Sequence, residues 1–182
     1  MLITLLGCLH GTLFLYQGEE LGLPEAELTY EQLMDPWGQH LYPAWQGRDG
    51  SRTPIPWDDF PQSIFSKDPW LPIPLSHKKL NRLDQETDSN STLNFTRKFV
   101  NWRKDMKTLR FGDIKFIDTD HRALLAFTRE YKDEKLVCIF NLQWKKLTIP
   151  ETLRENVEWI YGRTDDKGTL NKYEFKIGRV QY

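Results

Sequence analysis

The pattern of apolar and polar positions changes several times along the chain, and each change predicts a different kind of structure. Residues 1–9 are almost all apolar and predict a buried helix end or a strand. After a turn at Gly11-Thr12, the apolar run Leu13–Tyr16 is typical of a parallel strand that is buried on both faces. Glu19 and Glu20 follow directly, and such a carboxylate pair is expected at the carboxyl-end mouth of an α/β barrel, where catalytic groups lie.

The next stretch, residues 22–76, holds nine of the ten prolines, which forbid a long helix or strand there. It is also rich in Trp, so we expect an ordered loop. Long ordered loops are usually functional lids or binding loops.

Beyond residue 77 the spacing becomes helical, and Ser91–Lys107 is predicted to form one amphipathic helix, with Gly112 ending the helical region. From Asp113 onward the pattern alternates, which predicts antiparallel strands separated by turns, including a polar hairpin at Arg129–Lys135. The expected strands lie around Ile114 and Phe116 and at Leu124–Phe127, Leu136–Phe140, Lys146–Ile149, Trp159–Tyr161 and Tyr173–Ile177. These elements together predict a small β-sandwich.

Composition removes several classes of function. The net charge of −1 gives no electrostatic reason to expect a nucleic-acid or membrane partner. Met1–Leu15 lacks a basic start and a cleavage pattern and is too short to span a bilayer, so we interpret it as an internal barrel segment of a cytoplasmic protein.

The four histidines show no metal-ligand spacing, so no metal or cofactor site is predicted. Cys8 and Cys138 lie among apolar neighbours and are expected to be buried free thiols, with a disulfide as the alternative.

Aromatic residues make up 13% of the chain, and four tryptophans crowd its first half. Indole faces stack on the apolar C–H faces of sugar rings. Tryptophans in a Pro-rich loop can also simply cover the core beneath them, and composition alone favours this second interpretation. The four are Trp37, Trp45, Trp57 and Trp70.

Several linked motifs resemble one enzyme family. The run from Gly11 to Gly22, which contains Tyr16-Gln17-Gly18-Glu19-Glu20, resembles the last barrel strand of α-glucosidases of the α-amylase superfamily. Asp35-Pro36-Trp37-Gly38, the run Gly47-Arg48-Asp49-Gly50-Ser51-Arg52-Thr53-Pro54 and Pro69-Trp70-Leu71-Pro72 follow in family order. The resemblance is closest to the bacterial α-glucosidase branch.

The resemblance implies a fold class. Residues 1–110 would be the C-terminal end of a (β/α)₈ TIM barrel, with its last strand and helices, and residues 111–182 an antiparallel β-sandwich domain.

It also implies what this chain lacks. Retaining glycosidases use two carboxylic residues, a nucleophile and a general acid/base, about 5–5.5 Å apart. In the enzymes that this chain resembles, both lie on earlier barrel strands, together with a His-Asp pair that this sequence does not contain. Glu19 and Glu20 cannot replace them, because adjacent strand-end side chains point to opposite sides. We therefore expect no catalytic residue in this chain, no cofactor, and no turnover without the missing N-terminal barrel portion.

What the resemblance leaves is the part of the site that binds substrate. Arg48 matches the family arginine that contacts the innermost glucosyl unit, and its planar fork of donors suits a sugar hydroxyl. Asp49 and Arg52 are expected to form a salt-bridged frame that aims Arg48. Glu25 falls where this branch places a residue lining the neighbouring subsite, and Gln17 and Glu20 are expected to orient loops by hydrogen bonds.

These residues leave two hypotheses for the function, and a third possibility is that an upstream coding segment supplies the rest of the barrel, by fusion or as a companion polypeptide. The first is the C-terminal part of a retaining α-glucosidase that acts on maltose, sucrose or short malto- and isomalto-oligosaccharides. The second is a non-catalytic carbohydrate-binding or regulatory chain of the same superfamily.

Overall fold

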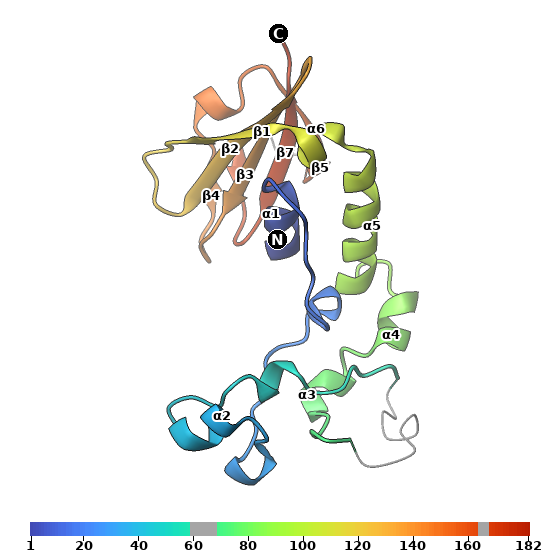
Figure 1. The fold of residues 1–182 in the computed structure, drawn as a ribbon. Helices are drawn as coiled ribbons and strands as arrows, with labels where there is room; N and C mark the ends of the chain where they lie inside the picture. Colours follow the sequence, from blue (N-terminus) through green and yellow to red (C-terminus); the bar gives the residue numbers. More distant parts are fainter. Residues whose placement is uncertain (59–68, 164–167) are drawn as a thin grey trace. The chain divides into compact units, whose positions relative to one another are not determined.

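The chain forms two compact units in a computed structural model that describes residues 1–58, 69–163 and 168–182 (Figure 1). Unit 1 combines Met1–Leu13 with Phe99–Tyr182, and unit 2 is Phe14–Lys98. None of the helices in the described ranges is both long and apolar enough to cross a membrane.

Unit 1 is built on a five-stranded antiparallel sheet in the order β1-β2-β3-β7-β5. A separate two-stranded ribbon pairs β4 with β6. The bounds are β1 Asp113–Ile117, β2 Leu124–Tyr131, β3 Glu134–Asn141, β4 Leu147–Thr148, β5 Val157–Gly162, β6 Thr169–Leu170 and β7 Phe175–Val180. The expected strands are therefore confirmed, and β2 and β3 form the expected hairpin, in which Tyr131 pairs with Glu134.

Side chains alternate between the two faces of the five-stranded sheet, and over the central strands β2, β3 and β7 most of them are buried on both faces. On one face an aliphatic cluster that includes Ala126 and Ile139 packs with Leu147 and Leu170 of the ribbon. The other face carries a row of stacked rings from Phe127, Phe140 and Phe175, with centroids 5.8 and 6.0 Å apart. The five-stranded sheet and the β4-β6 ribbon, packed together through the aliphatic cluster, are the two layers of the predicted sandwich.

Helices cover the aromatic face of the sheet. Helix α5 (Thr92–Asp105) places Trp102 against Tyr161 of β5, with ring centroids 4.3 Å apart. The predicted single helix Ser91–Lys107 is interrupted at Met106, whose ψ of 88° leaves the helical region, and α6 (Lys107–Phe111) continues to Gly112. Ser91 Oγ accepts the Asn94 N–H at 3.1 Å and caps the start of α5.

A fully buried arginine joins the two ends of unit 1. Arg129 of β2 donates from Nη1 to the Cys8 carbonyl at 2.5 Å and from Nη2 to the Gly112 carbonyl at 2.7 Å. These carbonyls end α1 (Leu2–Cys8) and α6, where the helix dipole favours a cation. The helix that the apolar residues 1–9 predicted is thereby fixed to the sheet.

The two cysteines are buried free thiols, as expected. Burial raises the pKa of the Cys138 thiol well above its usual range, so the thiol stays protonated at neutral pH.

Unit 2 consists mainly of loops fixed by short helices, as its prolines predict. Within the described part of unit 2, the helical elements are η1 (Glu19–Leu21), η2 (Tyr30–Gln32), α2 (Pro36–Leu41), η3 (Asp49–Ser51), α3 (Leu75–Lys78), α4 (Arg82–Thr87) and the start of α5. A small core of Ala26, Leu28, Leu33 and Leu71 lies beneath them. Gln85 connects these elements, since its Nε2 donates to the Leu21 and Leu80 carbonyls and its Oε1 accepts the Leu93 N–H.

The predicted strand Leu13–Tyr16 is wrong for this chain. No strand among the described residues pairs with this segment, which has no regular structure, and Phe14 is 82% exposed. A strand needs a hydrogen-bonded neighbour, and an apolar run alone does not supply one. The division into a barrel end and a sandwich domain at residue 110 stays a prediction.

Replacing Arg129 tests how unit 1 is held together. Arg129→Ala removes the side-chain donor of the buried Cys8 carbonyl and one of two contacts of the Gly112 carbonyl, which also lies 3.1 Å from His10 Nδ1. We expect this change to lower the free energy of unfolding by about 2 kcal/mol. Urea denaturation followed by far-UV circular dichroism measures this loss. Arg122→Ala, which changes an exposed arginine of the same unit, should stay within about 0.5 kcal/mol of the parent. An unchanged midpoint for Arg129→Ala would contradict the assigned role.

Candidate functional site

The predicted site residues divide between two hollows of unit 2. The smaller, of about 150 Å³, is called the Glu25 hollow, and the larger, of about 370 Å³, the Arg48 hollow. The Glu25 hollow is lined by Tyr16, Gln17, Glu19, Leu23, Pro24, Glu25, Gly50, Ser51, Thr53 and His77. The Arg48 hollow is lined by Met34, Asp35, Pro36, Trp37, Trp45, Arg48, Asp49, Arg52 and Trp70. Glu20 lines neither of the two.

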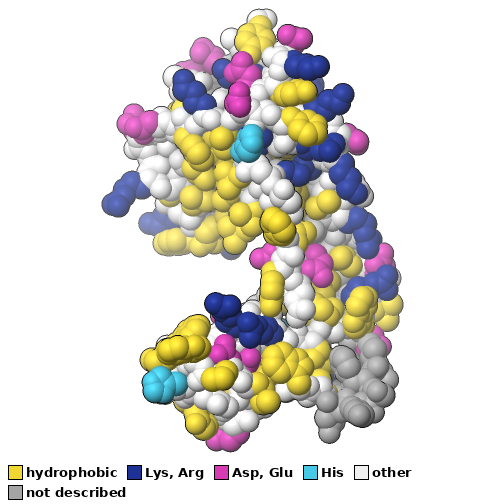
Figure 2. Space-filling view, viewed as in Figure 1, with side chains coloured by type: hydrophobic (Ala, Val, Ile, Leu, Met, Phe, Trp, Pro, Cys, Tyr) yellow, Lys and Arg dark blue, Asp and Glu magenta, His cyan; other side chains and the backbone are white. Residues whose placement is uncertain are grey.

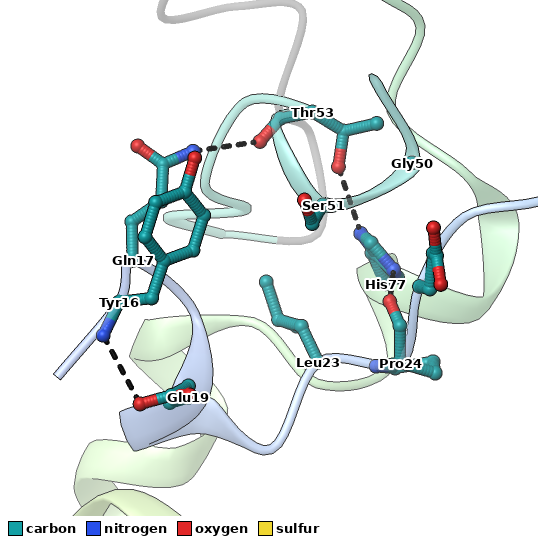
Figure 3. Close-up of a pocket in the computed structure, with 10 residues that line it drawn as sticks. Tyr16, Gln17, Glu19, Leu23, Pro24, Gly50, Ser51, Thr53 and His77 are labelled. Carbon is teal, nitrogen blue, oxygen red and sulfur yellow. Dashed lines mark hydrogen bonds between the residues drawn. The ribbon is translucent and has the colours of Figure 1, made fainter. Parts of the chain in front are cut away.

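A buried histidine organises the Glu25 hollow (Figure 3). His77 is 1% exposed, and its Nε2 lies 2.7 Å from the Pro24 carbonyl, which can only accept, so Nε2 carries the proton. In the neutral ring Nδ1 then accepts from the Thr53 hydroxyl at 3.3 Å. Gln17 Nε2 reaches the Thr53 carbonyl at 3.4 Å. These bonds connect the turn after Tyr16, the Glu25 loop and the Arg48 loop.

Neither His77 nor Thr53 was predicted to be a site residue. No spacing pattern in the sequence indicates either contact, because the partners lie 24 and 53 residues from His77.

The two adjacent glutamates serve the turn that precedes the Glu25 hollow. Glu19 Oε2 accepts the Tyr16 N–H at 3.0 Å, and Glu20 Oε2 accepts the Gly18 N–H at 2.9 Å. Gly18 has a φ of 90°, which favours glycine. Both carboxylates therefore bind backbone N–H groups of their own turn.

A pair of carboxylates, called here the carboxylate clamp, holds the loop that carries Arg48. Asp49 Oδ2 accepts the N–H groups of Met34 and Asp35 at 2.6 and 2.7 Å. In the opposite direction, Asp35 Oδ2 accepts the Arg48 N–H at 3.1 Å. Segments 34–35 and 48–49 are thus held to each other from both sides.

The expected salt-bridged frame is corrected by this geometry. Among the ion pairs of the described residues, none joins Asp49 to Arg52 or to Arg48. Asp49 is fully buried and one of its oxygens is taken by backbone donors, whereas Arg52 acts on Asp35 only as a nearby charge. The backbone N–H groups of Met34 and Asp35 therefore bind the Asp49 carboxylate, which the Arg52 guanidinium was expected to bind.

The clamp fixes the backbone of Arg48 and leaves its side chain exposed at the hollow. The Arg48 carbonyl accepts both the N–H and the hydroxyl of Ser51, at 3.1 and 2.9 Å. Gly47 has a φ of 72°, and a Cβ there would lie 2.8 Å from the Asp35 carboxyl carbon, so the close approach requires glycine. Asp35 was missed as a site residue, although an Asp before Pro36 is a recognisable helix N-cap signal.

The tryptophans are less covered than composition suggested. Trp37, Trp45 and Trp70 line the Arg48 hollow and are 65%, 45% and 56% exposed. In the space-filling view, hydrophobic side chains of unit 2 lie beside a small group of basic and acidic ones (Figure 2). Stacking surfaces and charged hydrogen-bonding groups therefore meet on one face.

The described residues contain no group of three or more His, Cys, Asp or Glu side chains that could hold a metal ion.

Comparison with known proteins identifies the family. The model of the alpha amylase catalytic domain matches residues 1–112. The chain belongs to the alpha-amylase family.

Relatives within this family are α-glucoside-processing enzymes by name. The chain is 46% identical over 143 residues to a probable alpha-glucosidase of Rhizobium meliloti strain 1021, covering 78% of this chain and 26% of that protein. Among solved structures, an alpha-glucosyl transfer enzyme is 38% identical with a TM-score of 0.89, over 99% of this chain and 35% of that one. The trehalose-6-phosphate hydrolase of Bacillus licheniformis is 26% identical with a TM-score of 0.85, over 98% and 37%.

These comparisons confirm the fold class of this alpha-amylase-family chain. It corresponds to the end of a family enzyme, in which barrel helices precede an antiparallel sandwich. The chain spans 26–35% of the length of the first curated relatives it matches.

The clamp predicts a measurable decrease in the pKa of Asp35. Its hydrogen bond from the Arg48 N–H is the main reason that the pKa of Asp35 is lowered from its usual value. The bond between Asp35 and the Arg48 N–H should therefore be fully present above the ordinary aspartate pKa and be lost as the pH falls through the lower folded value. A ¹³C NMR titration of the carboxyl carbon tests this, and a pKa above the ordinary value would contradict it.

Substitution tests the same bond from the other side. Asp35→Ala should speed hydrogen exchange of the Arg48 N–H at neutral pH, because its acceptor is gone, whereas Asp133→Ala in the exposed β2–β3 turn should not.

Proposed function

We propose that this chain is the part of a retaining α-glucosidase that carries substrate-binding residues. Its nucleophile and general acid/base would be supplied by barrel residues outside this chain, where the family resemblance places them. The parent's substrates would be α-glucosides such as maltose, sucrose and short malto- or isomalto-oligosaccharides, and its location the cytoplasm.

One observation carries this proposal: the backbone of Arg48 is fixed while its guanidinium stays exposed. The clamp and the Ser51 contacts hold the loop, so little conformational freedom remains to be lost when a ligand binds. The guanidinium can then donate one hydrogen bond to a sugar hydroxyl and another to a neighbouring carboxylate at the same time. Asp49 and Arg52 support this arrangement, Asp49 by its backbone contacts and Arg52 by its charge.

Glu25 would act beside Arg48. Its side chain is exposed, lines the neighbouring hollow, and lies against Gly50 two residues after Arg48. The Ala26 N–H donates to the Gly50 carbonyl at 2.9 Å, which holds the two loops together. Gln17 and Glu20 would keep the adjoining turn in place.

No carboxylate pair suited to glycosidic bond cleavage is proposed in this chain. Glu19 and Glu20 each bind a backbone N–H of their own turn, which supports the structural interpretation of both. In the parent enzyme, one carboxylate would attack the anomeric carbon to form a glycosyl-enzyme, and the other would protonate the leaving oxygen and then activate water.

Glucosyl transfer is a second candidate, and the likeness to an alpha-glucosyl transfer enzyme favours it. The two reactions share the glycosyl-enzyme and differ in whether water or a sugar hydroxyl attacks it. A non-catalytic carbohydrate-binding or regulatory chain is not favoured by the comparisons, whose named relatives are enzymes.

The purified chain should show no turnover. Maltose, sucrose and p-nitrophenyl α-glucoside should release no glucose or nitrophenol above the uncatalysed rate, because the proposal assigns both catalytic carboxylates to residues outside this chain. Release of α-glucose that is lost in Arg48→Ala would contradict this proposal.

Binding tests the role of Arg48 separately from turnover. Saturation-transfer NMR with maltose should detect an interaction that Arg48→Ala weakens by about tenfold or more, as for a hydrogen bond to a charged group. Arg48→Lys should restore it only in part, because an ammonium lacks the planar fork. Arg154→Ala, in unit 1, is the matched control and should bind as the parent chain does. Equal binding by Arg48→Ala and the parent would remove Arg48 from the site.

A further inference from the structure

Two buried thiols lie in contact inside unit 1, away from the hollows of the candidate site. Cys8 ends α1 and Cys138 lies in the middle of β3, and both side chains are 0% exposed. The Cys8 thiol is within hydrogen-bonding reach of the Cys138 thiol and contributes to the raised pKa of Cys138. A helix and a strand that are far apart in the sequence therefore meet at the two cysteines of the chain.

The pairing of β2 with β3 explains why these thiols meet. Cys138 pairs with Phe127, and Arg129 pairs with Leu136, two residues away on each strand. Side chains two residues apart on a strand share a face, so Cys138 and Arg129 point to the same side of the sheet. Arg129 donates to the Cys8 carbonyl on this side, which brings the end of α1 over the face that carries Cys138 (Figure 1).

A second arginine holds the same end of α1. Arg103 of α5 donates from Nε to the Gly7 carbonyl at 2.6 Å and from Nη2 to the Gly11 carbonyl at 3.1 Å. Gly7 lies against the Phe99 ring, which leaves no room for a Cβ. The backbone around Cys8 is therefore fixed, and this keeps its side chain beside Cys138.

We propose that Cys8 and Cys138 form a redox site, whose oxidation by a small-molecule disulfide links α1 to β3 covalently. In the first step one cysteine thiolate attacks a sulfur of the oxidant, which breaks the S–S bond of the oxidant and releases one small thiol. In the second step the other cysteine thiolate attacks the mixed disulfide, forms the Cys8–Cys138 bond and releases the second small thiol. Two protons and two electrons thereby pass from the cysteines to the oxidant, which becomes two thiols.

Burial makes the opening of α1 a required part of this reaction. The thiolate is the reactive form of cysteine, and burial disfavours it at Cys138, so the closed structure protects the thiols. Helix α1 has only seven residues and exposes Leu2 and Leu6, and a helix this short is marginal on its own. Separation of α1 from the sheet exposes both thiols, and its return brings them together for the second step.

The expected consequence is a fold whose stability depends on the redox state. The bond closes the stretch between residues 8 and 138 into one loop, and a crosslink across so long a loop strongly restricts the unfolded chain. By reciprocity, the bond should favour the fold by the same factor by which the fold favours the bond. A cytoplasm normally keeps thiols reduced, so the bond would form when oxidised small thiols accumulate.

Equilibration of the full 182-residue chain with mixtures of reduced and oxidised glutathione tests the site. Intact mass spectrometry measures the fraction of chains that have lost two hydrogens, and peptide mapping without reductant identifies the Cys8–Cys138 link. We expect the equilibrium constant for oxidation to be on the order of a hundredfold greater in buffer than in concentrated urea. Dithiothreitol should reverse the reaction.

The oxidised and reduced forms of the same chain give the energetic test without a substitution. Oxidation should raise the urea midpoint of the far-UV circular dichroism signal by roughly 1–2 M. Cys8→Ala and Cys138→Ala are the matched controls, because each leaves a single thiol. Treatment with the same glutathione mixture should leave the midpoint of each variant where it was before treatment.

Several results would overturn the proposal. Chain dimers or glutathione mixed disulfides in place of the internal bond would do so. An equal equilibrium constant in buffer and in urea would show that the fold does not bring the thiols together, and a chain without a cooperative urea transition would give this same result. Alkylation of both thiols by iodoacetamide as fast in buffer as in urea would contradict the protection by α1. These measurements involve no sugar, so each of these outcomes leaves the proposed function unchanged.

Discussion

The reciprocal clamp of Asp35 and Asp49 is the contact on which the candidate site depends. Burying the Asp49 carboxylate completely is unfavourable unless donors replace water. The N–H groups of Met34 and Asp35 are such donors, and they are available only while segment 34–35 stays against segment 48–49. The need to solvate one buried charge therefore fixes the geometry of the loop, and the position of Arg48 follows from it.

Much of unit 1 could be predicted because its elements are encoded by local pattern. The alternation in Leu124–Phe127 and Leu136–Phe140 reflects a sheet with two chemically different faces, and the polar residues between them allow a tight hairpin. The break at Met106 was missed because nothing in the residues around it disfavours a helix. The strand Leu13–Tyr16 was over-predicted because an apolar run indicates burial but does not identify the partner that would bury it.

The site was predictable in its residues and less so in its contacts. Arg48 and Glu25 could be selected from motifs, and the structure places them on adjacent loops that line neighbouring hollows. Asp49 and Arg52 were expected, as part of the family motif, to form a salt-bridged frame that aims Arg48, whereas Asp49 binds backbone N–H groups. Backbone N–H groups are present at nearly every residue, so sequence cannot show which of them a carboxylate will bind. The same limit hid His77, whose ring connects two loops that are distant in sequence.

The bond between Arg129 and Cys8 has a consequence for the order in which the chain can fold. The two residues are 121 positions apart, and the donor is made long after the helix that needs it. At a synthesis rate of about 5–20 residues per second, α1 would wait roughly 6 to 24 s for this partner. All of unit 2 is synthesised before the first residue of β1. During this interval the apolar side of α1 has no sheet to cover it, so this surface stays open to other contacts until β2 has been made.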